Sequence, residues 1–596
     1  MGNLLDIIFW LIYGFRIPSM LHIMQQESYQ NDGMFRWIIN NPKKAFKRNV
    51  TLFLAVLVSY FIFLFGLFTL YNQNYISKEQ FINTSYAPTI FSMIIFIVGN
   101  IILFIKEHKE RKNAKKPLVY TARAKRLIFN NIIAIILLQF IFMQNYSNFY
   151  PQEIKDNLSF GSYYINMIEA SGDKELENKI EQKHIEAVNY DNDITIRYST
   201  ILYAFLTLAM PLNMIIANFI GSPTETYINE KYIKKAYKKL NKKEYKDLIK
   251  IGITGSYGKT STKFILATIL GEKYNVLATP GSYNTTMGNV RVIREMLKEE
   301  HQVFISEMGA RKKGDIREIC NFVNPNIGII TSIGEQHLDT FKNIQNIQKT
   351  KGELLDGVGA EGAIFLPKDN NYCFELYKKD SHKNKFIFST TDKASDIYSK
   401  DIKVSCEGST FTVVSSKNGE YTCTTKLLGE HNVQNIIGAI AIAEYLGLSK
   451  EEIILGVSKI KPIEHRLQII PSANGTIVID DAFNKNPEGS KRAIDVLSKF
   501  DGRKIIITPG MVELGEKEKE LNKEFGKEMA NVLDIVILIG ISRSKPIEDG
   551  LVENGFNKDN IYIVKDLNEA TKKLSEITKQ GDVILFENDL PDSYNE

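Results

Sequence analysis

The stretch Thr254-Gly255-Ser256-Tyr257-Gly258-Lys259-Thr260 decides the fold expected for the second half of this chain. It follows a strand-like apolar segment, 248–253, and precedes a helix-like one, which is the setting of a phosphate-binding loop. Because residue 253 is isoleucine, the loop is a T-G-x-x-G-K-T variant of the commoner G-x-x-x-x-G-K-[ST] pattern. Glycines let backbone N–H groups approach phosphate oxygens, the lysine neutralises phosphate charge, and the threonine hydroxyl can bind Mg²⁺. The predicted nucleotide-binding residues are Gly255, Ser256, Gly258, Lys259, Thr260 and Ser261.

Four apolar runs without a charged residue precede that loop. Each is close to the roughly 20 residues that a helix needs to cross a bilayer. The third is the shortest and alone would also suit a buried helix of a soluble domain, but four such runs together indicate a membrane region. The predicted spans are 50–70, 87–105, 127–143 and 200–220.

The distribution of lysine and arginine predicts how these spans are oriented. Segments rich in both residues stay on the cytoplasmic side of a membrane, and here they are 43–48, 106–126 and 231–243. The segment 72–86 has one lysine and 144–199 is predominantly acidic, so both are expected outside. The sequence therefore predicts a multi-pass protein whose N-terminus and nucleotide-binding part are cytoplasmic.

The first segment of the chain is expected to lie at the membrane without crossing it. Residues 4–15 are apolar except for Asp6, but a dozen residues are too few to span. The segment also lacks the small-residue cleavage pattern of a signal peptide. It predicts an interfacial or re-entrant helix.

Charge and cysteine usage exclude some classes of partner. The 596-residue chain has a formal net charge of only +5, and its basic residues concentrate beside the spans, where anionic lipid headgroups attract them. Membrane lipids are therefore expected partners and nucleic acid is not. The four cysteines all lie in the predicted cytoplasmic part with no C-x-x-C spacing, which is typical of reduced thiols.

After residue 248, short β-rich apolar runs alternate with longer helical patterns, which predicts an α/β fold with a largely parallel sheet. A second set of strands after residue 465 predicts a second, smaller α/β domain. The strand candidates are 249–254, 303–307, 327–331, 363–366, 476–479, 504–508, 535–539, 561–564 and 583–586. The predicted domains are an N-terminal segment 1–48, a four-helix membrane region 49–221, a basic linker helix 222–249, a central ATP-binding domain 250–463 and a C-terminal domain 464–596.

Three polar residues are candidate ligands, and two of them lie near predicted strand ends. Glu307 ends an apolar strand, and open α/β sheets place ligand-binding groups at the carboxyl ends of their strands, so Glu307 suits Mg²⁺. His337 follows the next strand at the same edge, but its position fits a ligand and a structural polar residue equally well. Lys351 is, on spacing alone, an ordinary solvated lysine of a helix.

The soluble region resembles the Mur ligase family, most closely its MurF-type members, from about residue 250 to 590. Several separate motifs occur in the order that the family has them. The matching stretches are TGSYGKTST at 254, SYNTTMG at 282, SEMGA at 306, GEQHLDTF at 334, KTKGELL at 349, LLGEHNVQNIIGAIAIAEYLG at 427, HRLQII at 465, DDAFNKNPEG at 480 and MVELGE at 511.

This resemblance implies a P-loop central domain, a Rossmann-like C-terminal domain, ATP, and two Mg²⁺ ions. It implies that Thr260 and Glu307 help to bind one Mg²⁺, and that His337 and a carbamylated Lys351 hold the second. Together with Lys259 these are the catalytic residues that the resemblance assigns: Lys259, Glu307, His337 and Lys351.

Five further residues take nucleotide-site roles only by resemblance. Asn435 is expected beside the nucleotide, and Arg466 and Asp481 near the phosphates and ribose. Asn484 and Asn486 are expected near the nucleotide or the amine substrate. On residue type alone, Asn435 also fits a core or cap position, Arg466 a surface ion pair, and Asp481 a turn.

The reaction that the resemblance implies is ATP-dependent amide synthesis, and the apolar runs place it in a bacterial plasma membrane protein. A substrate carboxylate attacks the γ-phosphate to give an acyl phosphate and ADP, and an amine then displaces phosphate. The expected amine is an amino acid or a dipeptide such as D-Ala-D-Ala. The expected acceptor is a peptidoglycan-like cell-envelope precursor, either UDP-linked or lipid-linked.

Two departures from the family concern the substrates. Membrane helices replace the N-terminal domain with which soluble MurF-type enzymes recognise the UDP-sugar, which favours an acceptor at the cytoplasmic membrane face. The acidic tail 586–592 stands where the family has a basic K-G-S-R-like ending, which suggests a different amine or acceptor end.

Two other functions remain as alternatives. A poly-γ-glutamate synthase-like ligase also joins a membrane anchor to a Mur-type core, but the HNVQN and DDAFNKNP stretches disfavour it. An ATP-binding scaffold of an envelope-synthesis complex would make no bond. The intact Lys259, Glu307, His337 and Lys351 argue against such a scaffold.

Overall fold

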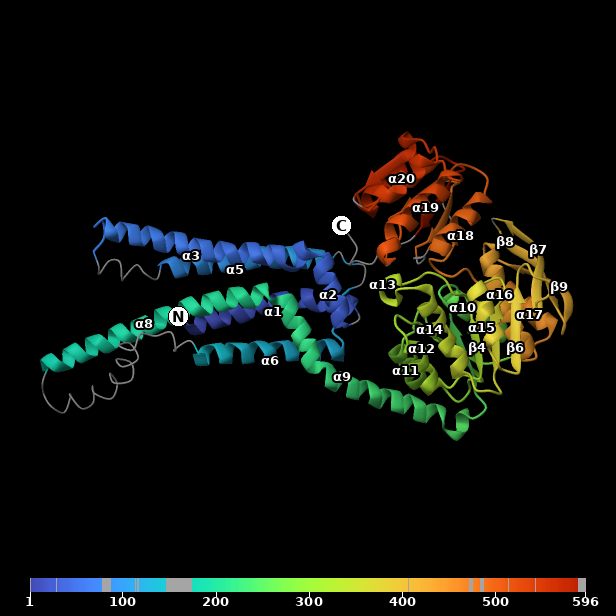
Figure 1. The fold of residues 1–596 in the computed structure, drawn as a ribbon, viewed down its shortest axis with the longest axis horizontal. Helices are drawn as coiled ribbons and strands as arrows, with labels where there is room; N and C mark the ends of the chain where they lie inside the picture. The colour runs from blue at the N-terminus through green and yellow to red at the C-terminus, as the bar shows by residue number, and fades with distance from the viewer. Residues whose placement is uncertain are drawn as a thin grey trace. The chain divides into compact units, whose positions relative to one another are not determined.

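The chain divides into two compact units, Met1–Tyr227 and Ile228–Glu596. This computed structural model describes residues 2–27, 29–77, 87–112, 114, 117–145, 174–405, 407–470, 475–482, 487–512, 514–541 and 543–587 (Figure 1). The division falls inside one long helix, α9 (Met210–Leu240). Each unit has its own hydrophobic core and is described separately.

The first unit is entirely helical over its described residues. Four of its helices are long and apolar enough to cross a membrane, and a fifth candidate is a pair of helices bent by 75° around Ala209. The elements are α1 (Gly2–Gln26), α2 (Asn31–Asn40), η1 (Lys43–Lys47), α3 (Arg48–Asn72), α5 (Ala87–Lys112), α6 (Ala122–Asn145), α8 (Lys174–Leu208) and α9. The four unbent candidates are Asp6–Gln26, Asn49–Asn72, Ile90–Lys112 and Ala122–Phe142.

Three sequence expectations about this unit need correction. The segment 4–15 is part of α1, a helix of 25 residues that passes through Pro18, so it is not too short to span. The predicted fourth span, 200–220, is not one straight helix, because α8 ends at Leu208 and α9 starts at Met210 in a new direction. Much of the predicted outer loop 144–199 is helix α8, while 146–173 lies outside the described residues.

A buried network of charged and polar side chains explains how the apolar helix α1 accommodates its only arginine. Arg16 is 1% exposed, and its guanidinium donates to both carboxylate oxygens of Glu107 on α5, at 3.1 and 2.5 Å. It also donates to Asn100 Oδ1 at 2.8 Å and to Asn49 Oδ1 at 2.9 Å. The charge is therefore neutralised inside the unit, and one side chain joins α1, α3 and α5.

We expect Arg16→Met to destabilise the helical unit by about 3–5 kcal/mol, because it leaves the Glu107 carboxylate buried without a counter-charge. Adding Glu107→Leu should recover much of that loss. Thermal unfolding of the detergent-solubilised protein measures both, with exposed Lys109→Met on the same helix as control. A double variant less stable than Arg16→Met would contradict this account.

The second unit begins with a nine-stranded sheet in the order β2-β3-β1-β4-β5-β6-β7-β8-β9. Its strands pair in parallel from β2 to β7, and β7, β8 and β9 pair antiparallel. The strands are β1 (Ile249–Thr254), β2 (Val276–Ala278), β3 (Val303–Glu307), β4 (Ile327–Ile330), β5 (Ala363–Pro367), β6 (Asn384–Ser389), β7 (Ile397–Ser405), β8 (Gly408–Ser415) and β9 (Gly419–Thr425). The short element η3 (Lys243–Tyr245) leads from α9 into β1.

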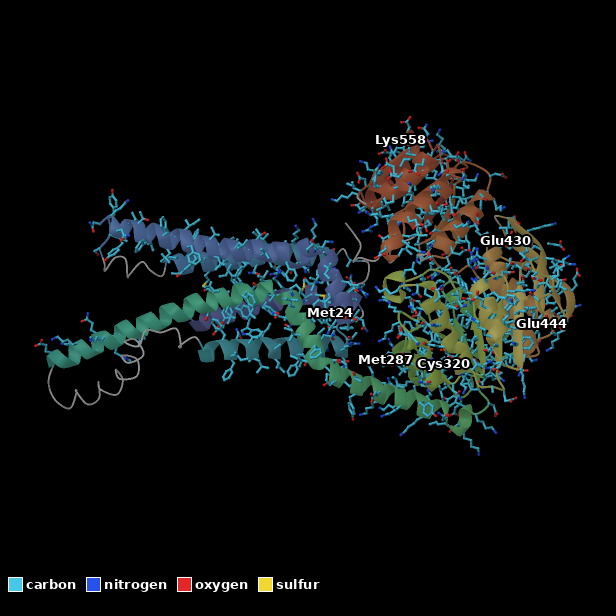
Figure 2. The ribbon with its side chains drawn as sticks, viewed as in Figure 1. Met24, Met287, Cys320, Glu430, Glu444 and Lys558 are labelled. Atoms are coloured by element: carbon cyan, nitrogen blue, oxygen red, sulfur yellow. The ribbon has the colours of Figure 1, made fainter. Side chains whose placement is uncertain are left out.

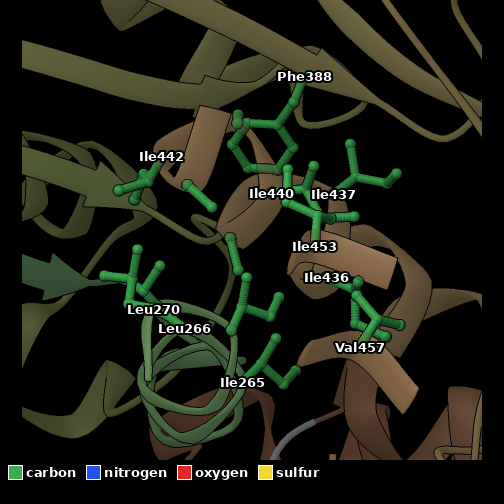
Figure 3. Packing of buried hydrophobic residues seen from close by; sticks show 14 of the residues in the cluster. Ile265, Leu266, Leu270, Phe388, Ile436, Ile437, Ile440, Ile442, Ile453 and Val457 are labelled. Carbon is green, nitrogen blue, oxygen red and sulfur yellow. The ribbon is translucent and has the colours of Figure 1, made fainter. Parts of the chain in front are cut away.

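Helices cover both faces of this sheet. One core contains Ile265 and Leu266 of α10 packed with Ile436, Ile440 and other side chains of α16 and α17 (Figure 3). The other core lies under α11, α12, α14 and α15 and takes in Ala236 at the end of α9. The helices are α10 (Lys259–Leu270), α11 (Thr286–Glu295), α12 (Asp315–Val323), α13 (Leu338–Phe341), α14 (Ile344–Gly357), α15 (Asn371–Lys379), α16 (Glu430–Tyr445) and α17 (Lys450–Ser458).

Buried Glu444 fastens the antiparallel end of the sheet to α16 (Figure 2). Its Oε1 accepts hydrogen bonds from Ser415 Oγ and Tyr421 OH, both at 2.9 Å, and from Asn418 Nδ2 at 3.1 Å. Because these donors come from β8, β9 and the turn between them, one carboxylate holds the hairpin against the helix.

The C-terminal part has a six-stranded sheet in the order β10-β11-β15-β12-β13-β14, parallel except for the edge strand β10. Its elements are β10 (Gln468–Ile470), β11 (Ile477–Asp481), α18 (Pro487–Ser498), β12 (Lys504–Thr508), η4 (Gly515–Lys517), α19 (Glu518–Ala530), β13 (Ile535–Ile539), α20 (Lys545–Glu553), η5 (Lys558–Asn560), β14 (Ile561–Val564), α21 (Leu567–Ile577) and β15 (Val583–Glu587). The predicted α/β fold class is confirmed. The strands β2, β6 to β9 and β10 were not predicted from the sequence.

Glu587 at the end of β15 is fully buried between two hydroxyl groups. It accepts hydrogen bonds from Ser490 Oγ at 2.5 Å and Thr508 Oγ1 at 2.6 Å. Burial raises the pKa of this carboxyl from 4.5 to about 7. The rest of the acidic tail, 588–592, lies outside the described residues.

We expect this carboxyl to make the stability of the C-terminal part fall as pH rises from about 4.5 through about 7. The folded state binds the proton more tightly than the unfolded state, so the contribution is complete at low pH and lost above the folded pKa. Relative to Glu587→Gln, wild type should lose about 3 kcal/mol across this window. Denaturant unfolding, followed by hydrogen exchange of the β15 amides, measures the free energy of unfolding at each pH. Equal pH dependence in wild type and Glu587→Gln would contradict this prediction.

Candidate nucleotide and metal site

The phosphate-binding loop joins β1 to α10, and its two glycines are required by their surroundings. Gly258 has a φ of 80°, and a Cβ there would lie 2.6 Å from Asn435 Oδ1. A Cβ on Gly255 would lie 2.1 Å from Thr331 Oγ1. Both distances are shorter than any real carbon contact, so side chains would displace the loop from α16 and from the segment after β4.

The loop is also fastened to the segment that follows β4. Ser256 N donates to Ser332 O at 2.8 Å, and Ser256 Oγ bonds both the N and the O of Gly334 at 3.0 Å. Tyr257 N donates to Ser332 Oγ at 3.0 Å. These bonds hold the start of the GEQHLDTF stretch beside the phosphate-binding loop, as expected for neighbouring parallel strands.

Lys259 lies over its own loop. Its Nζ donates to Gly255 O at 2.6 Å and to Ser256 O at 3.0 Å. Burial lowers the pKa of this ammonium to about 8, which nearby Glu307 opposes and Arg466 reinforces. An ammonium group held so close to the loop amides is suited to anionic phosphate. Ser261, in the first turn of α10, is buried.

Glu307 gathers three side chains, two from α10 and one from the loop before α11. It is fully buried, and its Oε1 accepts from Thr260 Oγ1 at 3.0 Å and from Asn284 Nδ2 at 3.1 Å. Its Oε2 lies 2.9 Å from Lys263 Nζ. The carboxylate and the threonine hydroxyl therefore meet as hard oxygen donors, the type that Mg²⁺ prefers.

Sequence reasoning gave no role to Lys263 or Asn284. The available signal was the position of Lys263 one helical turn after Lys259, which puts both lysines on the same side of α10. Asn284 stands in the quoted SYNTTMG stretch, but nothing in its spacing indicates that it turns back to Glu307.

His337 and Lys351 sit in different surroundings. His337 is partly buried with a φ of 51°, at the start of α13, where its carbonyl accepts from Thr340. Lys351 on α14 is 2% exposed, so it is not the solvated lysine that its spacing suggests. Burial lowers its pKa well below the usual value, Lys259 lowers it further, and Asp315 and Glu353 oppose the shift.

Within the described ranges, no three His, Cys, Asp or Glu side chains gather closely enough to hold a metal ion. The oxygen donors at hand are instead a single carboxylate and a hydroxyl, Glu307 and Thr260. Such a sparse set fits Mg²⁺, which usually keeps several waters and takes further oxygens from substrate phosphates.

The remaining predicted nucleotide residues come from α16 and from the start of the C-terminal part. Asn435 accepts from Thr262 Oγ1 at 3.2 Å. Burial lowers the pKa of Arg466, and Asp481 and Glu307 oppose that shift, so Arg466 is within electrostatic reach of both carboxylates. Asp481 is buried and its Oδ1 accepts from Leu467 N at 3.1 Å. Asn484 and Asn486 lie outside the described residues.

Comparison with known proteins identifies the family. The Mur ligase middle domain matches residues 253–443, and the glutamate ligase domain of Mur ligases matches 465–587. The UDP-N-acetylmuramoyl-tripeptide--D-alanyl-D-alanine ligase of Bacillus subtilis is 31% identical over 339 residues, which cover 56% of this chain and 72% of that protein. The chain belongs to the Mur ligase family. The ligase of the same description from Escherichia coli is 28% identical over 291 residues, 49% of this chain and 64% of that protein.

Solved structures agree with this assignment. A MurF from Acinetobacter baumannii is similar with a TM-score of 0.55 and 25% identity, covering 60% of this chain and 77% of its own. A MurF ligase from Thermotoga maritima in complex with ADP has a TM-score of 0.54 and 26% identity, covering 60% and 80%. The predicted resemblance, the Mur ligase fold of the central and C-terminal parts and the enzyme class, an ATP-dependent acid–amino-acid ligase, are confirmed.

We expect Gly258→Ala to weaken ADP binding at least about tenfold, because alanine pays about 1–2 kcal/mol for the left-handed backbone and its Cβ meets Asn435. Titration calorimetry of the full chain with ADP and Mg²⁺ measures this. Gly359→Ala is the matched control, since its Cβ would meet nothing within 4 Å. Unchanged affinity in Gly258→Ala would contradict the assigned loop.

Proposed function

We propose that this chain is a membrane-anchored peptidoglycan-precursor ligase that uses ATP to join an amine to a carboxylate through an acyl phosphate. The observation that carries the proposal is the contact of Thr260 with Glu307 beside the phosphate-binding loop. The names of these relatives supply the first substrates to test, UDP-N-acetylmuramoyl-tripeptide and D-alanyl-D-alanine.

The reaction requires the protein to stabilise negative charge on the phosphoryl group more than to form a covalent bond with the substrate. The acceptor carboxylate attacks the γ-phosphate, ADP leaves, and the amine then attacks the acyl carbon and expels phosphate. Loop amides and the Lys259 ammonium stabilise the charge on the transferring phosphoryl group. Mg²⁺ bound through Thr260 and Glu307 would neutralise further phosphate charge.

A carbamate on Lys351 would supply the second metal-binding group, with His337. Carbon dioxide reacts with neutral amines, and burial of Lys351 lowers the pKa of its ammonium group, which favours the neutral form. The carbamate would convert a cationic side chain into an anionic oxygen ligand. The buried position on α14 is what supports this assignment.

We expect Lys351→Ala to lower kcat by about 100-fold or more, because it removes a metal-binding group that no neighbour replaces. Labelling with ¹³C-bicarbonate should give a carbamate NMR signal in wild type and in Lys349→Ala, whose side chain is exposed. The signal should vanish in Lys351→Ala. A signal that persists there would contradict the assignment.

The membrane part bears on which acceptor is used. The candidate spans support an anchored enzyme, and the lysine- and arginine-rich segments beside them favour a cytoplasmic ligase unit. Anchoring raises the effective concentration of an acceptor held at the same surface. A lipid-linked precursor therefore belongs beside the UDP-linked one among acceptors to test. An amino acid other than D-alanyl-D-alanine is the corresponding alternative amine.

The test is phosphate release by the detergent-solubilised protein with ATP and Mg²⁺ across UDP-linked and lipid-linked acceptors, each with D-alanyl-D-alanine and single amino acids. We expect release that requires both substrates, with a product of the matching mass. The acceptor that gives the higher kcat/KM identifies the substrate. ATP binding without release for any pair would contradict ligase activity and favour a scaffold.

A further inference from the structure

A second lysine on α10 is completely buried beside the proposed metal site. Lys263 Nζ lies 2.9 Å from Glu307 Oε2 and also donates to the carbonyl of Gly281. Burying an ammonium group is costly unless a charge and hydrogen-bond acceptors compensate it. Both compensations are present here, so Lys263 is tied to Glu307.

The two oxygens of Glu307 have different partners because of this lysine. Oε2 is taken by Lys263, which leaves Oε1 for Thr260 Oγ1 and Asn284 Nδ2. A carboxylate held on one side by an ammonium group cannot rotate freely. The oxygen that faces the phosphate-binding loop is therefore fixed before a nucleotide binds.

The second contact of Lys263 fixes the loop before α11. Gly281 accepts from Lys263 at one end of this loop, and Asn284 reaches Glu307 at the other end. The carbonyl of Asn284 also accepts from Gly309 N at 2.7 Å. One buried ammonium group thus links α10, β3 and the loop 281–284.

We propose that Lys263 is a positioning residue for the proposed cation site: it orients Glu307 and tethers the loop 281–284, so that Glu307 Oε1 and the Thr260 hydroxyl are aligned in advance. Lys263 is fully buried with Glu307 Oε2 and the carbonyl of Gly281 as its partners, so it acts through Glu307. This inference rests on the metal role proposed for Glu307.

The test is a double-mutant cycle on the full chain with Lys263→Met, Glu307→Gln and the two combined. Binding of Mn²⁺ at saturating ADP is measured from the EPR signal of the free ion. We expect Lys263→Met to weaken Mn²⁺ binding by about 10-fold or more, the usual effect of removing a group that orients a metal ligand. In the Glu307→Gln background the same change should alter affinity by less than about twofold.

A second variant separates positioning from folding. Lys263→Gln keeps an N–H donor for Glu307 and Gly281, so it should recover part of the Mn²⁺ affinity that Lys263→Met loses. ADP binding without metal should stay within about twofold of wild type in both variants, since Lys263 acts through the metal site.

Two outcomes would overturn this inference and leave the metal role of Glu307 intact. One is that Lys263→Met weakens Mn²⁺ binding equally in the wild-type and Glu307→Gln backgrounds. The other is that Lys263→Met does not weaken Mn²⁺ binding when Glu307 is present. Unchanged Mn²⁺ affinity in Glu307→Gln would instead overturn the metal role proposed for Glu307.

Discussion

The buried carboxylate of Glu307 is the constraint on which the arrangement of the site depends. Strands β1 and β3 are parallel neighbours with Ile253 paired to Glu307, so the loop after β1 starts beside this carboxylate. Thr260, Lys263 and Asn284 then converge on it from α10 and from the loop before α11. A buried carboxylate charge is stable only when charged and hydrogen-bonding partners surround it. The partners that stabilise Glu307 therefore also fix the orientation of its two oxygens.

The scaffold around this carboxylate keeps the phosphate-binding loop in place. Packing of α16 against α10 brings Asn435 to Gly258, and the segment after β4 closes the other side through Ser332 and Gly334. The C-terminal part approaches the same region, since Lys517 Nζ lies 2.7 Å from Glu335 Oε1. Residues far apart in sequence thus meet where parallel strands end, as open α/β sheets favour.

Much of the ligase unit was predictable because its central strands are continuous apolar runs between turn residues. Strands β1, β3, β12, β13 and β14 occupy the predicted ranges. Strands β7 to β9 were missed, since one face is polar and their Thr, Ser and Lys residues give no apolar run. Their identity as strands depends on antiparallel pairing, which is a tertiary property.

The individual side chains were harder to predict than the strands. The position of Glu307 at a strand end carried a signal, whereas the burial of Lys263 and Lys351 depends on which helix faces are covered. In the helical unit, the predicted first segment was too short because Arg16 interrupts the run of apolar residues that indicated it. Its neutralisation by Glu107 comes from a residue 91 positions away.

The most direct test of the central claim follows one oxygen atom. With an acceptor whose carboxylate carries ¹⁸O, attack on the γ-phosphate forms a labelled acyl phosphate, and the amine expels phosphate that keeps the bridging oxygen. With both carboxylate oxygens labelled, the account predicts one ¹⁸O in each phosphate released with product, as measured by mass spectrometry. Unlabelled phosphate would mean that water attacks ATP, which would contradict an acyl phosphate and with it the ligase mechanism.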